Sequence, residues 1–116
     1  MESIVEEKAF VFAKRIVNLY NYLIENKKEY VMSKQILKSG TSIGANIAES
    51  QCAQSKSDFI SKTHIALKES NETKYWLRLL NAMGYISDVE FESIYSDCCE
   101  IYKMLSSIII SSKNDE

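Results

Sequence analysis

The sequence contains no proline and only three glycines, Gly40, Gly44 and Gly84. Strand-rich domains need a turn about every 8–12 residues, and those turns are usually built from Gly, Pro, Asn and Asp. The chain is too poor in such residues for an all-β fold, so its 116 residues must form long helices. A chain of this length is the usual size of one domain. We therefore expect a single all-α domain covering residues 1–116.

Cysteine is also scarce, with an odd set of three: Cys52, Cys98 and Cys99. No CxxC spacing occurs, which excludes a zinc knuckle, a thioredoxin-like site and a disulfide framework. These residues are expected to be small core residues in a reducing compartment. The first seven residues are acidic where a signal peptide is basic. The longest aliphatic run is only 108–110, far below the ~20 residues of a membrane span. These absences predict a soluble, cytoplasmic protein.

Charge is nearly balanced but unevenly distributed. The net charge is −2, yet residues 8–78 carry twelve Lys and Arg against six Asp and Glu, whereas residues 79–116 carry two against seven. The middle of the chain is therefore basic (+6) and its last third acidic (−5). Near-neutral chains bind nucleic acid poorly, but a segregated chain can still present a basic face.

Four amphipathic segments are predicted to be helices, at about residues 3–25, 33–52, 55–83 and 87–112. Three of them begin with a capping-box spacing, in which a Ser hydroxyl and an acid three residues later satisfy free backbone N–H groups. Gly84 is placed to end the third helix in a left-handed conformation. The segment 26–30 is expected to be a polar, solvated connection. Short connections favour an antiparallel up-down-up-down bundle, and 3-4 apolar spacing favours a left-handed one. The capping pairs are Ser3 with Glu6, Ser55 with Asp58, and Ser87 with Glu90.

Apolar residues repeat at 3-4 spacing in each segment, which predicts the core-facing seams. In the first helix two adjacent stripes run side by side: Phe10, Ala13, Val17, Tyr20 and Ile24, taken as the main seam, and Ala9, Phe12, Ile16, Leu19 and Leu23, which widen it. The third seam is Phe59, Thr63, Ala66, Ser70, Thr73, Leu77 and Leu80. The fourth is Phe91, Ile94, Cys98, Ile101, Leu105 and Ile108, flanked by Tyr95, Tyr102 and Ile109.

Two glycines, Gly40 and Gly44, share one face of the second predicted helix. Each costs about 1 kcal/mol relative to alanine in a helix interior. A close approach by a neighbouring helix would account for that cost. Because the third seam is small in its middle, we expect the tight contact to join the second and third helices.

No pattern of catalytic residues is present. The only histidine, His64, cannot build the paired Glu-x-x-His motifs of di-iron bundles. Nucleophile elbows and HExxH motifs are absent. Residues 39–44 superficially resemble a glycine-containing phosphate loop, but the Gly-Lys-Ser/Thr ending and the preceding strand are missing. The sequence therefore predicts a protein that is not an enzyme and holds no cofactor or metal.

Several polar residues lie within the otherwise packed second and third helices. A hydrogen-bonded or ion-paired network with Lys68, Lys74 or Arg78 would hold the helices or subunits in register. Facing carboxylates could alternatively bind a metal through oxygen, or the residues could simply be solvated. The residues concerned are Asn46, Glu49, Glu69, Glu72 and Trp76.

Two of these segments carry a recognisable motif. Residues 42–49 read SIGANIAE, residues 57–60 read SDFI and residues 65–77 read IALKESNETKYWL. Together they resemble the bacterial four-helix bundle proteins named for open reading frames in 23S rRNA intervening sequences. The likeness is specific in the second and third helices and extends to the others only in pattern and length. Ser50 departs from the glycine that the family often has there.

The resemblance implies a left-handed bundle and a ring-shaped homopentamer, and it supplies no activity. One relative is the accessory variability protein of diversity-generating retroelements, a strongly basic pentamer that binds nucleic acid and a reverse transcriptase. Two classes of function follow. The chain is either an oligomeric scaffold or adaptor that binds a protein partner, or an RNA- or DNA-binding accessory protein that uses basic faces of its first three helices. Candidate nucleic-acid contacts are Lys34, Lys38, Lys62, Lys74 and Arg78.

The doubled apolar stripes of the first and last helices exceed what one bundle interior needs. Exposed together, they would form a contiguous apolar patch of a kind that monomers rarely tolerate. Repetition of one contact between unlike surfaces closes into a ring when the rotation permits. We therefore expect a cyclic homo-oligomer, and the resemblance points to five subunits.

Overall fold

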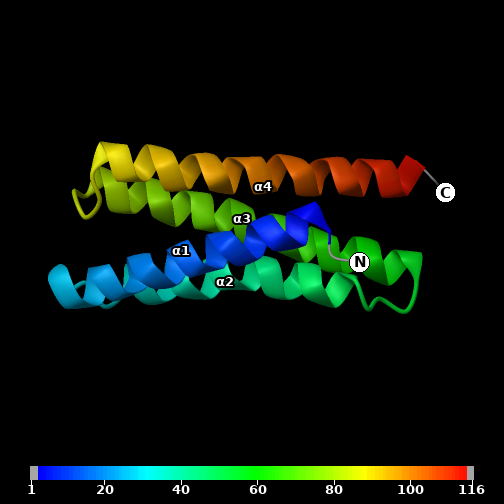
Figure 1. Ribbon diagram of the computed structural model, residues 1–116, viewed down its shortest axis with the longest axis horizontal. Helices are drawn as coiled ribbons and strands as arrows, with labels where there is room; N and C mark the ends of the chain where they lie inside the picture. Colours follow the sequence, from blue (N-terminus) through cyan, green and yellow to red (C-terminus); the bar gives the residue numbers. More distant parts are fainter. Residues whose placement is uncertain (1–2, 115–116) are drawn as a thin grey trace.

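Four long helices make up the structure, a computed structural model that describes residues 3–114. They are α1 (Ile4–Asn26), α2 (Met32–Ser50), α3 (Lys56–Ala82) and α4 (Asp88–Asn114). Figure 1 shows them lying lengthwise side by side in a rod of 48 × 22 × 20 Å. No strand occurs within residues 3–114, so the predicted all-α class is confirmed. No helix in this range combines the length and the apolar composition needed to cross a bilayer.

The starts of α1, α3 and α4 and the end of α3 are set by the residues that the sequence indicated. Serine hydroxyls accept a backbone N–H three residues on, at 3.0 Å from Glu6 to Ser3, 3.0 Å from Asp58 to Ser55 and 3.2 Å from Glu90 to Ser87. Gly84 follows α3 with φ +82°, and the next residue, Tyr85, donates its N–H back to the Leu80 carbonyl at 2.9 Å. This is the left-handed helix ending that glycine allows.

The connection between α1 and α2 differs from the prediction. Glu29 is buried, not solvated, because its carboxylate serves as the cap of α2. It accepts the N–H groups of Val31 at 3.2 Å, Met32 at 3.1 Å and Ser33 at 2.7 Å. The N-cap residue itself, Val31, offers no side-chain acceptor. A carboxylate at a helix N-terminus satisfies free donors and faces the positive end of the helix dipole.

The core contains the predicted seam of α3, but the other stripe of α1. Of the seven predicted seam residues, Phe59 is only half-buried and the other six are buried, as expected: Thr63, Ala66, Ser70, Thr73, Leu77 and Leu80. In α1 the buried residues are Val5, Ala9, Phe12, Ile16 and Leu23. Phe10 and Val17, which we assigned to the main seam, are exposed. In the last turns of α4, Ile109 is buried and Ile108 only partly so, the reverse of the prediction. The stripe that begins at Ala9, which we expected only to widen the main seam of α1, is therefore the stripe that faces the core.

The glycines of α2 pack against α1, not against α3 as predicted. A Cβ on Gly40 would lie 2.8 Å from both γ carbons of Ile16, and one on Gly44 would lie 3.6 Å from the Cβ of Ala9. Small hydroxyl residues meet where α2 faces α3: Thr73 donates to the Ser39 hydroxyl at 2.9 Å, and both side chains are buried. Every sequence-adjacent pair of helices packs closely, whereas α1 and α4 share the sparsest contact.

Candidate functional site

The polar motif residues of α2 and α3 do not form one network. Asn46 donates to the Ser42 carbonyl of its own helix at 2.8 Å. Trp76 donates its indole N–H to exposed Glu72 at 3.1 Å, also within one helix. Lys62 of α3 and Glu49 of α2 form a long ion pair, 3.9 Å, between the two helices. Pairs this long and exposed contribute little to stability.

Glu69 is half-buried on this α2–α3 face. Burial, and then the neighbouring Glu72 carboxylate, raise its pKa above the usual range, while Lys38 and Lys68 act in the opposite direction. We expected both Glu69 and Glu72 to be partly buried and paired with side-chain donors. Glu72 has its donor in Trp76 but is exposed. Within residues 3–114 no three His, Cys, Asp or Glu side chains converge as a metal site requires.

The five candidate nucleic-acid contacts occupy different surroundings. Lys62 pairs with Glu49, and Lys38 lies close enough to Glu69 to affect its titration. Lys74 lies 4.5 Å from the centre of the Tyr102 ring on α4, a cation–π contact on the other side of α3. Lys34 and Arg78 are exposed.

The remaining potentially reactive side chains are inert or isolated. Cys98 is buried, donates its thiol to the Ser70 carbonyl at 3.4 Å, and has a pKa raised to about 12 by burial. A thiol that stays protonated is neither a nucleophile nor a metal ligand at neutral pH. Cys52, which we expected in the core, is exposed, and Cys99 is half-buried. His64 is also exposed.

An apolar strip runs along the outer side of α1 and α2. Phe10 is 65% exposed and Val17 40% exposed on α1, although both belong to a helical apolar stripe. Beside Phe10 lies a hollow of about 700 Å³, whose floor on α2 consists of small residues. On the α1 side, the hollow is also lined by Glu6, Glu7, Val11 and Lys14. We call this surface the α1–α2 strip; its apolar and small members are Phe10, Ala13, Val17, Thr41, Gly44, Ala45 and Ala48.

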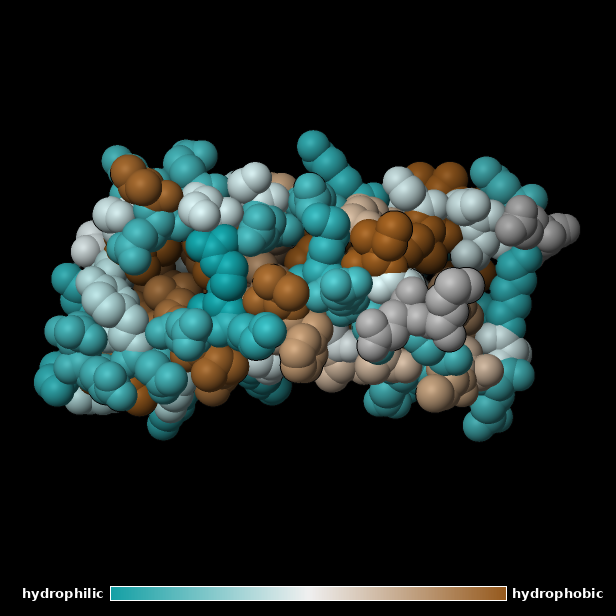
Figure 2. Space-filling view, viewed as in Figure 1, coloured by the Kyte–Doolittle hydropathy of each residue, from teal (hydrophilic) through white to brown (hydrophobic). Residues whose placement is uncertain are grey.

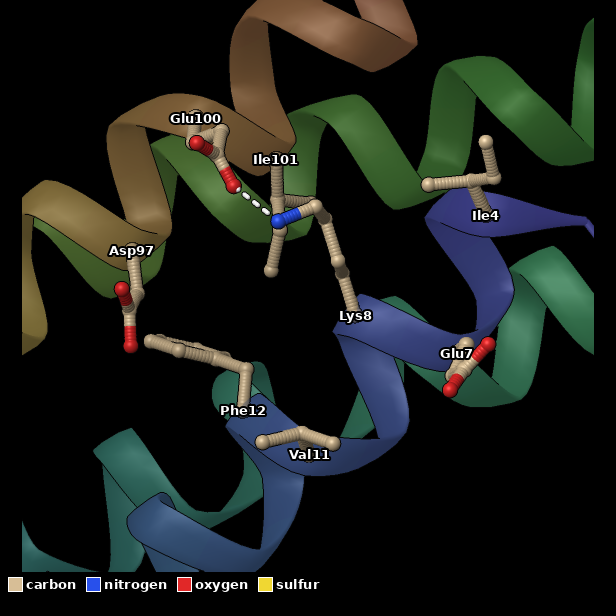
Figure 3. Close-up of a pocket in the computed structure, with 8 residues that line it drawn as sticks. All are labelled: Ile4, Glu7, Lys8, Val11, Phe12, Asp97, Glu100 and Ile101. Atoms are coloured by element: carbon tan, nitrogen blue, oxygen red, sulfur yellow. Dashed lines mark hydrogen bonds and ion pairs between the residues drawn. The ribbon is translucent and has the colours of Figure 1, made fainter.

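A groove separates α1 from α4. It contains two cavities of about 420 and 260 Å³ in line with each other. Figure 2 shows apolar surface inside a hollow on this face of the molecule. Lys8 of α1 reaches across to Glu100 of α4 (Figure 3), and Arg15 donates to Asp97 at 2.6 Å and to Ser93 at 3.0 Å. We call this the α1–α4 groove.

Sequence reasoning missed this groove. Lys8 and Arg15 lie seven apart on α1, and the acids at 97 and 100 share one face of α4. Such a spacing is compatible with a charged contact between the two helices. It does not predict a groove, because the width of the seam depends on how close α1 approaches α2.

Taken together, the geometry defines a small helical bundle whose notable features are surfaces between helices instead of a catalytic pocket. The chain belongs to the 23S rRNA-intervening sequence protein family, which residues 1–107 match. It is also similar to the crystal structure of a protein of unknown function from the S23 ribosomal protein family of Bacteroides thetaiotaomicron. That protein is 59% identical, with a TM-score of 0.91 over 91% of this chain and 98% of the other. None of the curated proteins matches the chain. Neither the family nor this relative indicates an enzymatic activity.

Proposed function

We propose that the protein is a non-enzymatic, cytoplasmic adaptor that works as a homo-oligomeric ring of single-domain, left-handed up-down-up-down bundles. The observation that carries the proposal is the α1–α2 strip. Phe10 projects from α1 with two thirds of its surface in water, beside a hollow floored by glycine and alanine. Burying one large aromatic ring in such a hollow is the kind of anchor that dominates protein interfaces.

The strip is suited to contacts between copies of the chain because it offers both a protruding ring and a depression. A copy that inserts Phe10 into the depression of its neighbour buries apolar surface on both sides. If each copy uses the ring on one neighbour and the hollow on another, the contact repeats around a closed circle. We propose five subunits, in line with the resemblance described above.

Light scattering tests the assembly. A pentamer of the 13.3 kDa subunit has a mass of about 67 kDa. Val17→Glu places a charge within the strip and should shift the mass toward that of the subunit. Val89→Glu is the matched control, since Val89 is a more exposed valine, 81%, in the first turn of α4 and away from the strip. A wild-type mass near 13 kDa at micromolar concentration contradicts the proposal.

A second candidate is RNA or DNA binding, favoured by the +6 charge of residues 8–78. Lys74 and Arg78 lie one turn apart on α3, and a ring would repeat this pair around one axis and sum weak contacts. A gel shift with structured rRNA at two salt concentrations tests it. Binding through phosphates weakens steeply with salt, and the double variant Lys74→Gln/Arg78→Gln should abolish it. Absence of any shift at low salt rejects this candidate.

A further inference from the structure

The seam between α1 and α4 is bridged by long charged side chains where a bundle normally interleaves apolar ones. Lys8 pairs with Glu100, and Arg15 pairs with Asp97. All four side chains are at least one third exposed. Ion pairs in such surroundings contribute little, because water screens them and ordering long side chains costs entropy. The two pairs therefore span the groove without closing it.

The width of the groove follows from the packing on the other side of α1. Gly40 and Gly44 allow α1 to settle closely on α2, with Ile16 and Ala9 against the glycine backbone. A helix held close to one neighbour leaves more room beside the other. Figure 1 shows α2 and α4 along opposite edges of the bundle, with α1 crossing in front and reaching α2 at its C-terminal end.

The walls of the groove combine exposed apolar side chains with an excess of carboxylates. Ile4 is 70% exposed and Val11 49% exposed at its rim, while Phe12 and Ile101 form its buried floor. The charged lining is Glu7, Lys8, Asp97 and Glu100 in one cavity, and Arg15 and Glu90 in the other. Glu7 lies at the outer rim of α1, where it also lines the hollow of the α1–α2 strip. Lys8 and Arg15 are each already bound to a carboxylate, so the surplus charge is negative.

We propose that the α1–α4 groove binds a basic amphipathic helix of a partner protein. The apolar face of that helix covers Val11 and Ile4, and its Lys or Arg side chains meet Glu7 and Glu90. An amphipathic helix in an apolar groove is a recurrent mode of peptide recognition, and complementary charge selects the partner. This inference rests on the adaptor function proposed above, for which it names the chemistry of the partner.

The probes are two synthetic helical peptides with the same Leu and Ile face, one with Lys and Arg on its polar face and the other with Glu. Fluorescence anisotropy should show that the full-length chain binds the basic peptide and that the acidic peptide binds at least about tenfold more weakly. The variant Glu90→Lys should weaken binding of the basic peptide by a similar factor, because Glu90 lines the groove and not the hollow of the α1–α2 strip. Glu92→Lys is the control with the same charge change, since Glu92 is exposed on α4 and lines neither cavity.

Methyl NMR spectra locate the binding. The signals of Ile4 and Ile101, which line the groove and not the hollow of the α1–α2 strip, should move on titration with the basic peptide, while that of Val17, on the strip, should not. Equal affinity for both peptides, movement of Val17 alone, or no binding at about 1 mM peptide overturns the inference. So does movement of Ile4 and Ile101 with protein concentration alone, because that outcome assigns the groove to a second copy.

Subunit number is measured separately by light scattering. A monomer that binds the basic peptide contradicts the ring and supports the groove. A ring that ignores the peptide contradicts the groove alone.

Discussion

Replacing Gly40 by alanine should destabilise the protein, whereas the same change at Gly44 should stabilise it. Alanine gains about 1 kcal/mol over glycine in a helix interior at either position. At Gly40 the new Cβ would lie 2.8 Å from both γ carbons of Ile16, which is fully buried and part of the core. Contacts between carbon atoms are optimal at about 3.5–4.0 Å, so Ile16 and its neighbours must shift. Overpacking of this kind costs about 1–3 kcal/mol.

Gly40→Ala should therefore lose up to about 2 kcal/mol net, because the overpacking cost exceeds the gain in helix propensity. At Gly44 the new Cβ would lie 3.6 Å from the Ala9 Cβ, an ordinary contact, so the full gain in propensity should be observed. Urea unfolding followed by circular dichroism measures both free energies of unfolding.

The decisive control is Gly40→Ala made in the Ile16→Ala variant. Ile16→Ala alone should cost about 2–5 kcal/mol because it opens a cavity. In that background Gly40→Ala should become stabilising, because its Cβ then enters empty space. If Gly40→Ala and Gly44→Ala change the free energy of unfolding by the same amount, or if the sign of Gly40→Ala is unchanged by Ile16→Ala, the close approach of α1 to α2 is refuted.

Three further changes test other contacts. Glu29→Ala removes the acceptor of three backbone N–H groups and should cost about 1–3 kcal/mol of unfolding free energy, with a smaller loss for Glu29→Gln, as urea titration would show. Burial raises the pKa of Glu69, so the folded chain binds that proton more tightly than the unfolded chain and stability falls as the pH rises through this pKa. Glu69→Gln should thus raise the melting temperature at about pH 7, where the glutamate is charged, and have little effect at about pH 3, where it is protonated. An equal effect at both pH values would contradict the raised pKa of Glu69. Cys98, whose pKa is about 12, should react with thiol reagents at about pH 8 only on unfolding, whereas exposed Cys52 should react at once.

The elements that were predictable from sequence are those encoded locally. Ser3, Ser55 and Ser87 accept N–H groups three residues on, and such a bond depends only on adjacent residues. The left-handed ending at Gly84 is local for the same reason. Glu29 was missed because the usual capping residues are short and occupy the N-cap position itself. A Glu two residues before the N-cap, Val31, is easily taken for part of a polar linker.

The choice between the two stripes of α1 required more than spacing. Both the Phe10 stripe and the Ala9 stripe repeat at 3-4 intervals, so periodicity alone cannot separate them. Glu7, Lys14 and Asn21 lie seven apart on the side of the helix opposite Phe12 and Ile16. That polar face was the available signal for the buried stripe.

The partner of the glycines could not be predicted in the same way. Gly40 and Gly44 indicate that some helix approaches closely, but α2 has a neighbour on each side. Ser39, next to Gly40, is the residue that contacts α3 through Thr73. Consecutive residues of α2 thus face different helices, Ser39 facing α3 and Gly40 facing α1. The apolar pattern of the sequence does not determine the rotation of a helix about its axis that finely. The α1–α4 groove depends on this same choice and was missed with it.

The sparse contact between α1 and α4 has a consequence for the order in which the chain folds. It is the one helix pairing that joins the two ends of the sequence, whereas the pairings of α1 with α2, α2 with α3 and α3 with α4 each close only a short connection. Folding rates rise as contacts become more local, because less chain entropy is lost before contacts form. The helical hairpins α1–α2, α2–α3 and α3–α4 can therefore assemble first. The pairing of α1 with α4, which has the sparsest contact, can form last without limiting the folding rate.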